Sequence, residues 1–143
     1  MLAVCPVKER TPTIVTDRYD VLIADKNPHI RDFLRREFTA AGYTVRVAEN
    51  SHQLLRIIYG KDPLDLLIMD PDLPGADAAN LAKKLCDRVP PLPVVLHTLE
   101  PEHQSRRWSL CRSHWIEKNG CSIENLKQAV AGILPVSPPP VSK

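Results

Sequence analysis

Several features that mark membrane, secreted and metal-binding proteins are missing from this sequence. No apolar run approaches the roughly 20 residues that a membrane-spanning helix needs. The N-terminus lacks the basic head, apolar middle and small-residue cleavage site of a secretory signal. The 4 cysteines include no Cys-x-x-Cys pair, so neither a zinc knuckle nor a disulfide framework is indicated. We therefore expect a cytoplasmic protein with reduced thiols and no membrane partner.

A strong charge of one sign is also missing. The formal net charge of +2 is too small to indicate nucleic-acid binding, and we expect none by this domain. The 5 histidines show no His-x-x-x-His spacing, so we interpret them as structural or surface residues. With 143 residues, 43% of them hydrophobic, the chain suits one globular domain with a core large enough to fold alone.

What the sequence does contain is a regular alternation of strand and helix patterns. The predicted strands are Tyr19–Ala24, Thr44–Ala48, Leu64–Met69, Val94–Thr98 and Trp115–Lys118. The predicted helices cover Pro28–Ala41, about 51–60, Asp77–Val89, Pro101–Cys111, and a last segment capped by Ser122 and ending by Leu134. Because crossovers between parallel strands are right-handed, this order predicts an α/β protein with a parallel sheet and helices on both faces.

The two ends of the chain do not follow this alternation. Residues 1–18 carry two prolines and no clear periodicity, so we expect an irregular N-terminal extension. Residues 19–134 form the predicted domain. Residues 135–143 are rich in proline and cannot continue a helix, which indicates a stiff tail or a linker.

Chemically active side chains follow four of the five predicted strands. The apolar run Leu64–Met69 leads directly into Asp70, and Asp25 follows the first strand. Thr98 and Lys118 end the fourth and fifth strands. Open α/β sheets bind ligands at the carboxyl ends of their strands, so these groups should converge. Two acids that hold a divalent cation, with a lysine and a hydroxyl that meet phosphate oxygens, are typical of a phosphoryl-transfer site.

This pattern resembles the receiver domain of bacterial two-component response regulators. Each residue alone is a weak signal, but four of them in order, each at a strand end, are a strong one. The resemblance implies a flavodoxin-like (βα)5 three-layer sandwich, a five-stranded parallel sheet of order 2-1-3-4-5, and a signalling module that is not an enzyme. The resemblance covers Tyr19 to Leu134 and rests on Asp25, Asp70, Leu73-Pro74-Gly75, Asp77, Thr98, Trp115 and Lys118.

The resemblance also implies the roles of the acidic residues. Asp70 matches the phosphoacceptor, which takes a phosphoryl group from a sensor histidine kinase. Asp25 matches an acidic ligand of the Mg²⁺ site, to which Asp70 also contributes, and Asp72 matches the position that lends its backbone carbonyl. The family usually has a second acid after the first strand, where this chain has Lys26. A cation there should weaken Mg²⁺ binding by repulsion.

The other matched residues imply a conformational switch. Thr98 matches the hydroxyl that moves toward the phosphoryl group, and Lys118 matches the lysine that pairs with its oxygens. Trp115 matches the aromatic residue that reports this movement at the face formed by the fourth helix, fifth strand and fifth helix. That face is the expected output surface for a downstream protein and a candidate homodimer surface.

Two further departures concern the surroundings of the pocket. Leu99 stands where the family prefers a small residue, and its bulk is expected to crowd the pocket. Asn119 stands where the family has a proline after the lysine.

Three alternatives arise from these departures, from the Asp70-Pro71-Asp72 motif and from the sheet order that flavodoxins share. One is a pseudo-receiver that binds a protein partner without phosphorylation. Another is a phosphatase of the haloacid-dehalogenase type, which needs further acids after Lys118, where only Glu124 remains. A flavin-binding flavodoxin would need a Ser/Thr/Gly-rich loop after the first strand, where the chain has Asp25–Pro28. In the receiver interpretation the partner is a sensor kinase or a phosphotransfer protein.

Overall fold

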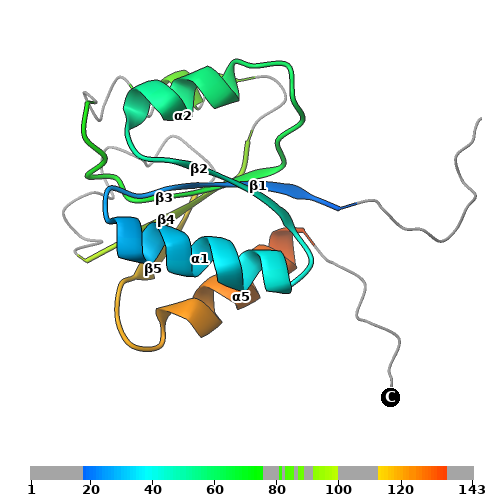
Figure 1. The fold of residues 1–143 in the computed structure, drawn as a ribbon, viewed down its shortest axis with the longest axis vertical. Helices are drawn as coiled ribbons and strands as arrows, with labels where there is room; N and C mark the ends of the chain where they lie inside the picture. Colours follow the sequence, from blue (N-terminus) through cyan, green and yellow to red (C-terminus); the bar gives the residue numbers. More distant parts are fainter. Residues whose placement is uncertain are drawn as a thin grey trace, which may run out of the picture.

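The computed structural model describes residues 18–75, 81, 83–85, 87–88, 92–99 and 113–134. Its five strands form one parallel sheet in the order β2-β1-β3-β4-β5 (Figure 1). This confirms the predicted flavodoxin-like α/β fold and the strand order 2-1-3-4-5. The strands are β1 (Asp20–Ala24), β2 (Thr44–Ala48), β3 (Leu66–Met69), β4 (Val94–Thr98) and β5 (Ser113–Glu117).

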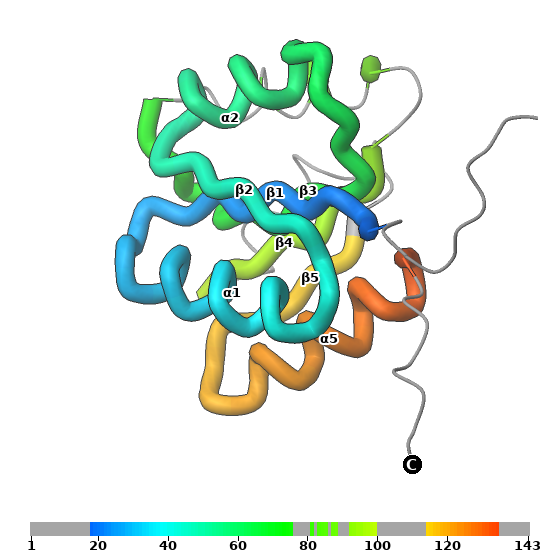
Figure 2. Tube along the Cα trace, turned by 45° about the vertical axis from the view of Figure 1, so that its right-hand side comes forward, coloured from blue at the N-terminus to red at the C-terminus, as the bar shows by residue number. Residues whose placement is uncertain are grey.

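Helices cover both faces of the sheet. The described helices are α1 (Pro28–Ala40), α2 (Ser51–Ile58) and α5 (Ser122–Ile133). Helices α1 and α5 lie on one face and α2 on the other, and the tube in Figure 2 shows the same three layers from another side. The Asn27 side chain caps α1 by accepting hydrogen bonds from the backbone N–H groups of His29 and Ile30. Asn50 caps α2 in the same way, through the N–H of Gln53.

The core is divided into two apolar clusters by the sheet. All residues of β3 are buried, as expected for a central parallel strand that is covered on both faces. Leu67 and Met69 face the α2 side, whereas Leu66 and Ile68 face the α1 and α5 side. Each such side chain contributes roughly 1.5–3 kcal/mol through burial. Packing on both faces therefore stabilises the sheet and holds the ends of its strands in place.

Several predicted boundaries were wrong, among them the start of β3, which is Leu66 rather than Leu64. Strand β5 begins two residues earlier than predicted, because Ser113 already pairs with Val94, and it ends at Glu117. Lys118 lies immediately after the strand. Ser122 is the first residue of α5 rather than its cap, and the cap position is occupied by Cys121, whose side chain makes no capping hydrogen bond.

Other predictions lie mostly outside the described residues. Of the predicted helix at 77–89 only residues 81, 83–85 and 87–88 are described, and 81 and 83–85 are helical. The predicted helix at 101–111, residues 1–17 and the tail at 135–143 are not described. Within the part of the chain that is described, no helix is long and apolar enough to span a membrane.

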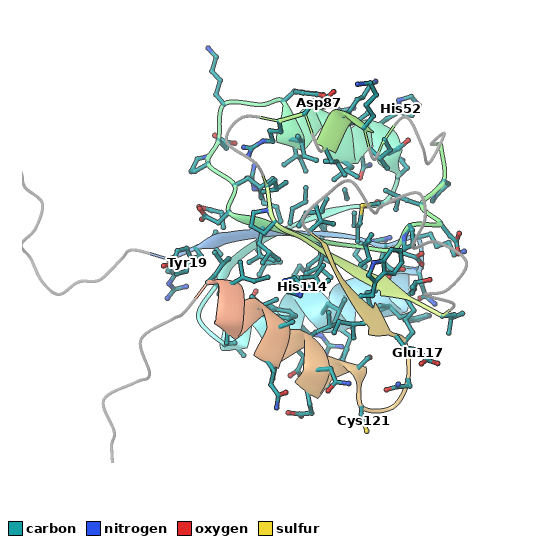
Figure 3. All side chains as sticks on the ribbon, turned by 180° about the vertical axis from the view of Figure 1, so that it is seen from behind. Tyr19, His52, Asp87, His114, Glu117 and Cys121 are labelled. Carbon is teal, nitrogen blue, oxygen red and sulfur yellow. The ribbon has the colours of Figure 1, made fainter. Side chains whose placement is uncertain are left out.

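The parallel arrangement brings the carboxyl ends of all strands to one edge of the sheet. In Figure 3, Glu117 at the end of β5 lies at the opposite end of the sheet from Tyr19, which precedes β1. Residues 25, 70, 98 and 118 all lie at the edge marked by Glu117. The fold therefore gathers the predicted site residues at one place.

Candidate functional site

Asp25 and Asp70 are held in the same way at the ends of two adjacent strands. The backbone N–H of Asp25 donates to the carbonyl of Ala48, and that of Asp70 donates to the carbonyl of Ala24. Each carboxylate then accepts a backbone N–H from two residues further on: Asp25 Oδ1 from Asn27 and Asp70 Oδ1 from Asp72, both at 2.8 Å. Asp25 and Asp70 are 2% and 3% exposed. The turns after β1 and β3 therefore fix both carboxylates.

Lys118 joins the two carboxylates. Its Nζ lies 2.7 Å from Asp70 Oδ2 and 3.1 Å from Asp25 Oδ2. Its backbone N–H donates to the carbonyl of Thr98 at 2.7 Å, which continues the pairing of β4 with β5 by one residue. The structure thus brings Asp25, Asp70 and Lys118 into direct contact, although they are widely separated in the sequence.

The charges in this cluster act on each other in a largely buried environment. Burial raises the pKa of Asp25, and the Asn27 N–H and Lys118 only partly oppose this effect. Burial by itself would lower the pKa of Lys118, but the hydrogen bond to Asp70 and the charges of both acids raise it. One ammonium group therefore serves two carboxylates and remains charged at neutral pH.

Thr98 and Trp115 are neighbours on the α2 face of the sheet. Thr98 is buried at the end of β4. Trp115 is paired with Leu96 and packs against the apolar cluster on the α2 face. Since alternate residues of a strand share a face, Thr98 follows Leu96 on that face and lies diagonally opposite Trp115. Thr98 and Trp115 therefore occupy diagonally adjacent positions on the same face of two paired strands.

The three unusual residues near the pocket have different surroundings. Leu99 is 69% exposed, so most of its side chain faces solvent rather than the buried carboxylates. The Asn119 side chain accepts the N–H of Cys121 at 2.8 Å and shapes the turn into α5. Lys26 is exposed at the turn between Asp25 and Asn27.

Two residues near the site were not assigned a role from the sequence. Arg31 donates from Nη1 to the backbone carbonyl of Asp25 at 2.8 Å. Its position in the first turns of α1, directly after the strand end, was the only available signal. His97 is buried beside Thr98, and neither ring nitrogen has a hydrogen-bond partner in the described part of the chain. Burial lowers the pKa of His97 to about 4, and nothing in the sequence indicated this.

Asp25 and Asp70 can hold a divalent cation, but they supply few protein ligands. The described residues contain no group of three or more His, Cys, Asp or Glu side chains suited to a metal ion. However, Asp25 Oδ2 and Asp70 Oδ2 both contact the Lys118 ammonium, so they can share one cation. Two carboxylates and a backbone carbonyl fit Mg²⁺, which usually keeps several of its waters.

Comparisons with known proteins agree with this fold. The family described as "Response regulator receiver domain" matches residues 21–131. The transcriptional regulator NtrC of Salmonella typhimurium is 36% identical over 78 residues, 54% of this chain and 16% of NtrC. The sensor protein EvgS of Escherichia coli O157:H7 is 31% identical over 93 residues, 65% of this chain and 8% of EvgS. The chain thus spans less than a fifth of the length of either relative.

Solved structures show the same fold. The response regulator TrrA of Thermotoga maritima, in complex with Mg²⁺ and BeF, has a TM-score of 0.70 and 24% identity over 81% of this chain and 99% of that one. The chemotaxis regulator CheY4 of Vibrio cholerae has a TM-score of 0.72 and 22% identity over 82% and 99%. TrrA in complex with the histidine kinase ThkA has a TM-score of 0.70 and 23% identity over 81% of this chain and 98% of that one.

Proposed function

Since this chain belongs to the family of response regulator receiver domains, we propose that it accepts a phosphoryl group on Asp70 from a sensor histidine kinase or a phosphotransfer protein. Receiver domains are modules of two-component signalling and are generally not enzymes. The observation that carries the proposal is the contact of Lys118 Nζ with both Asp70 and Asp25 at the carboxyl edge of the sheet. This contact supports the proposal because it leaves the proposed nucleophile beside a cation that can pair with phosphoryl oxygens.

The proposed step is an attack by an Asp70 carboxylate oxygen on the phosphorus of a phosphohistidine. A new O–P bond forms while the P–N bond breaks, and its electron pair stays on the imidazole nitrogen of the donor. Asp70 Oδ1 accepts a hydrogen bond from the backbone N–H of Asp72. Asp70 Oδ2 is therefore the attacking oxygen in this proposal, because its partner is the Lys118 side chain, which can move. Lys118 then pairs with the transferred phosphoryl oxygens, and Thr98 moves to meet them.

Access to Asp70 requires a movement, because Asp70 is almost completely buried. Its side chain is 4% exposed and that of Lys118 is 11% exposed. We propose that the donor draws Lys118 away from Asp70 as the phosphoryl group approaches, since the phosphoryl oxygens offer the ammonium an equivalent partner.

Asp25, Asp70 and the backbone carbonyl of Asp72 would hold Mg²⁺ in this site. The ion would neutralise charge on the phosphoryl oxygens. Lys26 lies next to Asp25 and should weaken this binding. The TrrA structure with Mg²⁺ and BeF supports the assignment through the shared fold.

The signal would leave through Thr98 and Trp115, which occupy diagonally adjacent positions on β4 and β5. A change from 1:99 to 99:1 in the population of active protein needs about 5.5 kcal/mol of preferential stabilisation. New bonds from Thr98 and Lys118 to the phosphoryl group must supply this energy. We propose that the surface around β5 and α5 then binds a downstream protein or a second copy of the chain. The kinase partnership, for which the TrrA–ThkA complex is a precedent, would place the protein in the cytoplasm.

The direct test is labelling with acetyl phosphate followed by mass spectrometry. We expect one phosphoryl group per chain on the wild type and none on the Asp70→Asn variant, because the amide cannot act as the nucleophile. Asp65→Asn is a matched control, since Asp65 lies near the opposite edge of the sheet, where it accepts the N–H of Asp20. Equal labelling of wild type and Asp70→Asn would contradict the proposal.

A second candidate is a pseudo-receiver that binds a partner without phosphorylation. It is favoured by the closed state of the pocket, in which all four oxygens of Asp25 and Asp70 already have protein partners. Complete absence of labelling, together with an intact fold, would select this candidate.

A further inference from the structure

Three basic residues are linked to Asp25, two of them by contact and one by its place in the sequence. Lys118 contacts its carboxylate, Arg31 donates to its backbone carbonyl, and Lys26 follows it directly in the chain. In contrast, among the described residues the buried carboxylates here are those of Asp25 and Asp70, and the nearby Asp72 is exposed. The described part of the site therefore combines two buried carboxylates with three basic residues close to one of them.

Two of these cations already have partners in the pocket. Lys118 is shared by two carboxylates, and Arg31 is bound to a carbonyl group. Lys26 makes no ion pair with any residue that the structure describes. It is exposed at the apex of the turn that the Asn27 N–H closes on Asp25 Oδ1, at the carboxyl edge of the sheet. Its flexible stem lets the ammonium group approach an anion bound at Asp70.

Phosphorylation changes the charge balance of the pocket. Asp25 and Asp70 together carry two negative charges. When Asp70 becomes an acyl phosphate it loses its own charge, but the phosphoryl group brings about −1.5 to −2. Lys118 alone cannot balance this group together with Asp25, and Arg31 is already bound to the Asp25 carbonyl. A second cation that can reach the phosphoryl oxygens is needed, either a metal ion or a side chain.

We propose that Lys26 is this second cation, and that it lets the site accept a phosphoryl group with little dependence on Mg²⁺. This inference rests on the proposed phosphorylation of Asp70. With acetyl phosphate as donor, an Asp70 oxygen forms a bond to phosphorus while the bond between phosphorus and the acetate oxygen breaks. Acetate leaves with the electron pair. The Lys26 ammonium group acts on the phosphoryl oxygens as a positive charge and transfers no proton.

The first experiment measures the rate of labelling by acetyl phosphate with Mg²⁺ and with EDTA. We expect the wild type to slow less than about tenfold without Mg²⁺, and Lys26→Met to slow by more than about tenfold under the same condition, since one nearby charge is lost. Lys26→Arg should restore the metal-free rate. Lys61→Met is the matched control, because Lys61 is also an exposed lysine but lies in the loop before β3, at the opposite edge of the sheet.

The second experiment measures metal binding without any phosphoryl donor. Titration with Mn²⁺, followed by electron paramagnetic resonance, should show binding that tightens from the wild type to Lys26→Met and again to Lys26→Asp. Repulsion is removed in the first variant and replaced by attraction in the second. Thermal melting of each variant checks that the fold is retained.

The outcomes separate this inference from the proposed function. Labelling that occurs only with Mg²⁺, at the same rate in wild type and Lys26→Met, overturns the role of Lys26 but leaves phosphorylation of Asp70 intact. Equal Mn²⁺ affinity in all three proteins also overturns it. Absence of labelling under every condition overturns the proposed function and, with it, this inference.

Discussion

At the scale of single residues, the least expected feature is His97. It lies in β4 between Leu96 and Thr98, on the side of the sheet that α1 and α5 cover. It is buried, and neither nitrogen has a hydrogen-bond partner among the described residues. A buried polar group without a partner costs about 1–3 kcal/mol. Burial of the His97 imidazole therefore lowers the free energy of unfolding at a position adjacent to Thr98, the proposed switch residue.

His97 should make stability dependent on pH. Its pKa is about 4 in the fold and 6.5 as a free side chain, so the unfolded chain binds the additional proton between these values. Above pH 6.5 the protonation of His97 does not affect the free energy of unfolding. As the pH falls from 6.5 toward 4, the free energy of unfolding decreases by on the order of 3 kcal/mol in total. Urea unfolding at pH 7 and pH 5 measures the effect.

Two variants separate the charge of His97 from its polarity. His97→Leu should be about 1–3 kcal/mol more stable than wild type at pH 7, because a similar volume is filled without an unpaired polar group, and its advantage should grow at pH 5. His97→Gln should lose the pH dependence without the gain at pH 7. A less stable His97→Leu at pH 7 would show that the imidazole is satisfied in solution.

At the scale of secondary-structure elements, the turn after β3 is tied to the start of α2. The backbone N–H of Ser51 donates to the carbonyl of Pro74 at 3.0 Å. Gly75 follows with a φ of +85°, and a Cβ built there would lie 2.9 Å from Ser51 Oγ. The same turn carries Asp72, whose N–H holds Asp70. The packing of α2 therefore helps to position the proposed phosphoacceptor.

Substitution of Gly75 should test this connection. Gly75→Ala places a side chain in a left-handed conformation, which costs roughly 1–2 kcal/mol before the contact with Ser51 is included. We expect a loss of at least that size in urea unfolding, and slower labelling of Asp70. Gly132→Ala is the matched control: Gly132 lies in α5 with nothing within 4 Å of its added Cβ. Alanine there should stabilise the protein by about 0.5–1 kcal/mol. Equal effects at both positions would contradict the argument.

At the scale of the whole molecule, the parallel sheet connects the phosphoryl site to the surface around β5. Thr98 and Trp115 are neighbours on one face of two paired strands. In a Trp108→Phe background, Trp115 is the remaining tryptophan of the chain. Its fluorescence should change when beryllofluoride is added, and Thr98→Ala should reduce that change. An identical response in both proteins would place the switch elsewhere.

Much of the molecular architecture follows from local sequence patterns. The short apolar runs that end in Asp25, Asp70 and Thr98 predict buried strands, and helix signals such as Asn27 before Pro28 predict where α1 starts. The start of β5 could not be predicted, because pairing with β4 rather than β propensity includes Ser113 in the strand. The start of α5 was also missed, since Cys121 occupies the cap position without a capping hydrogen bond.

Local sequence patterns were enough to identify the chemical groups at the strand ends and to predict that parallel pairing gathers them at one edge. The contacts of Lys118 with both carboxylates, the return of Arg31 to the Asp25 carbonyl, and the burial of His97 without a partner among the described residues became visible only in the folded chain. The reason is physical: strand and helix patterns act over a few neighbouring residues. Contact, burial and pKa depend on side chains that the packed core brings together from distant parts of the chain.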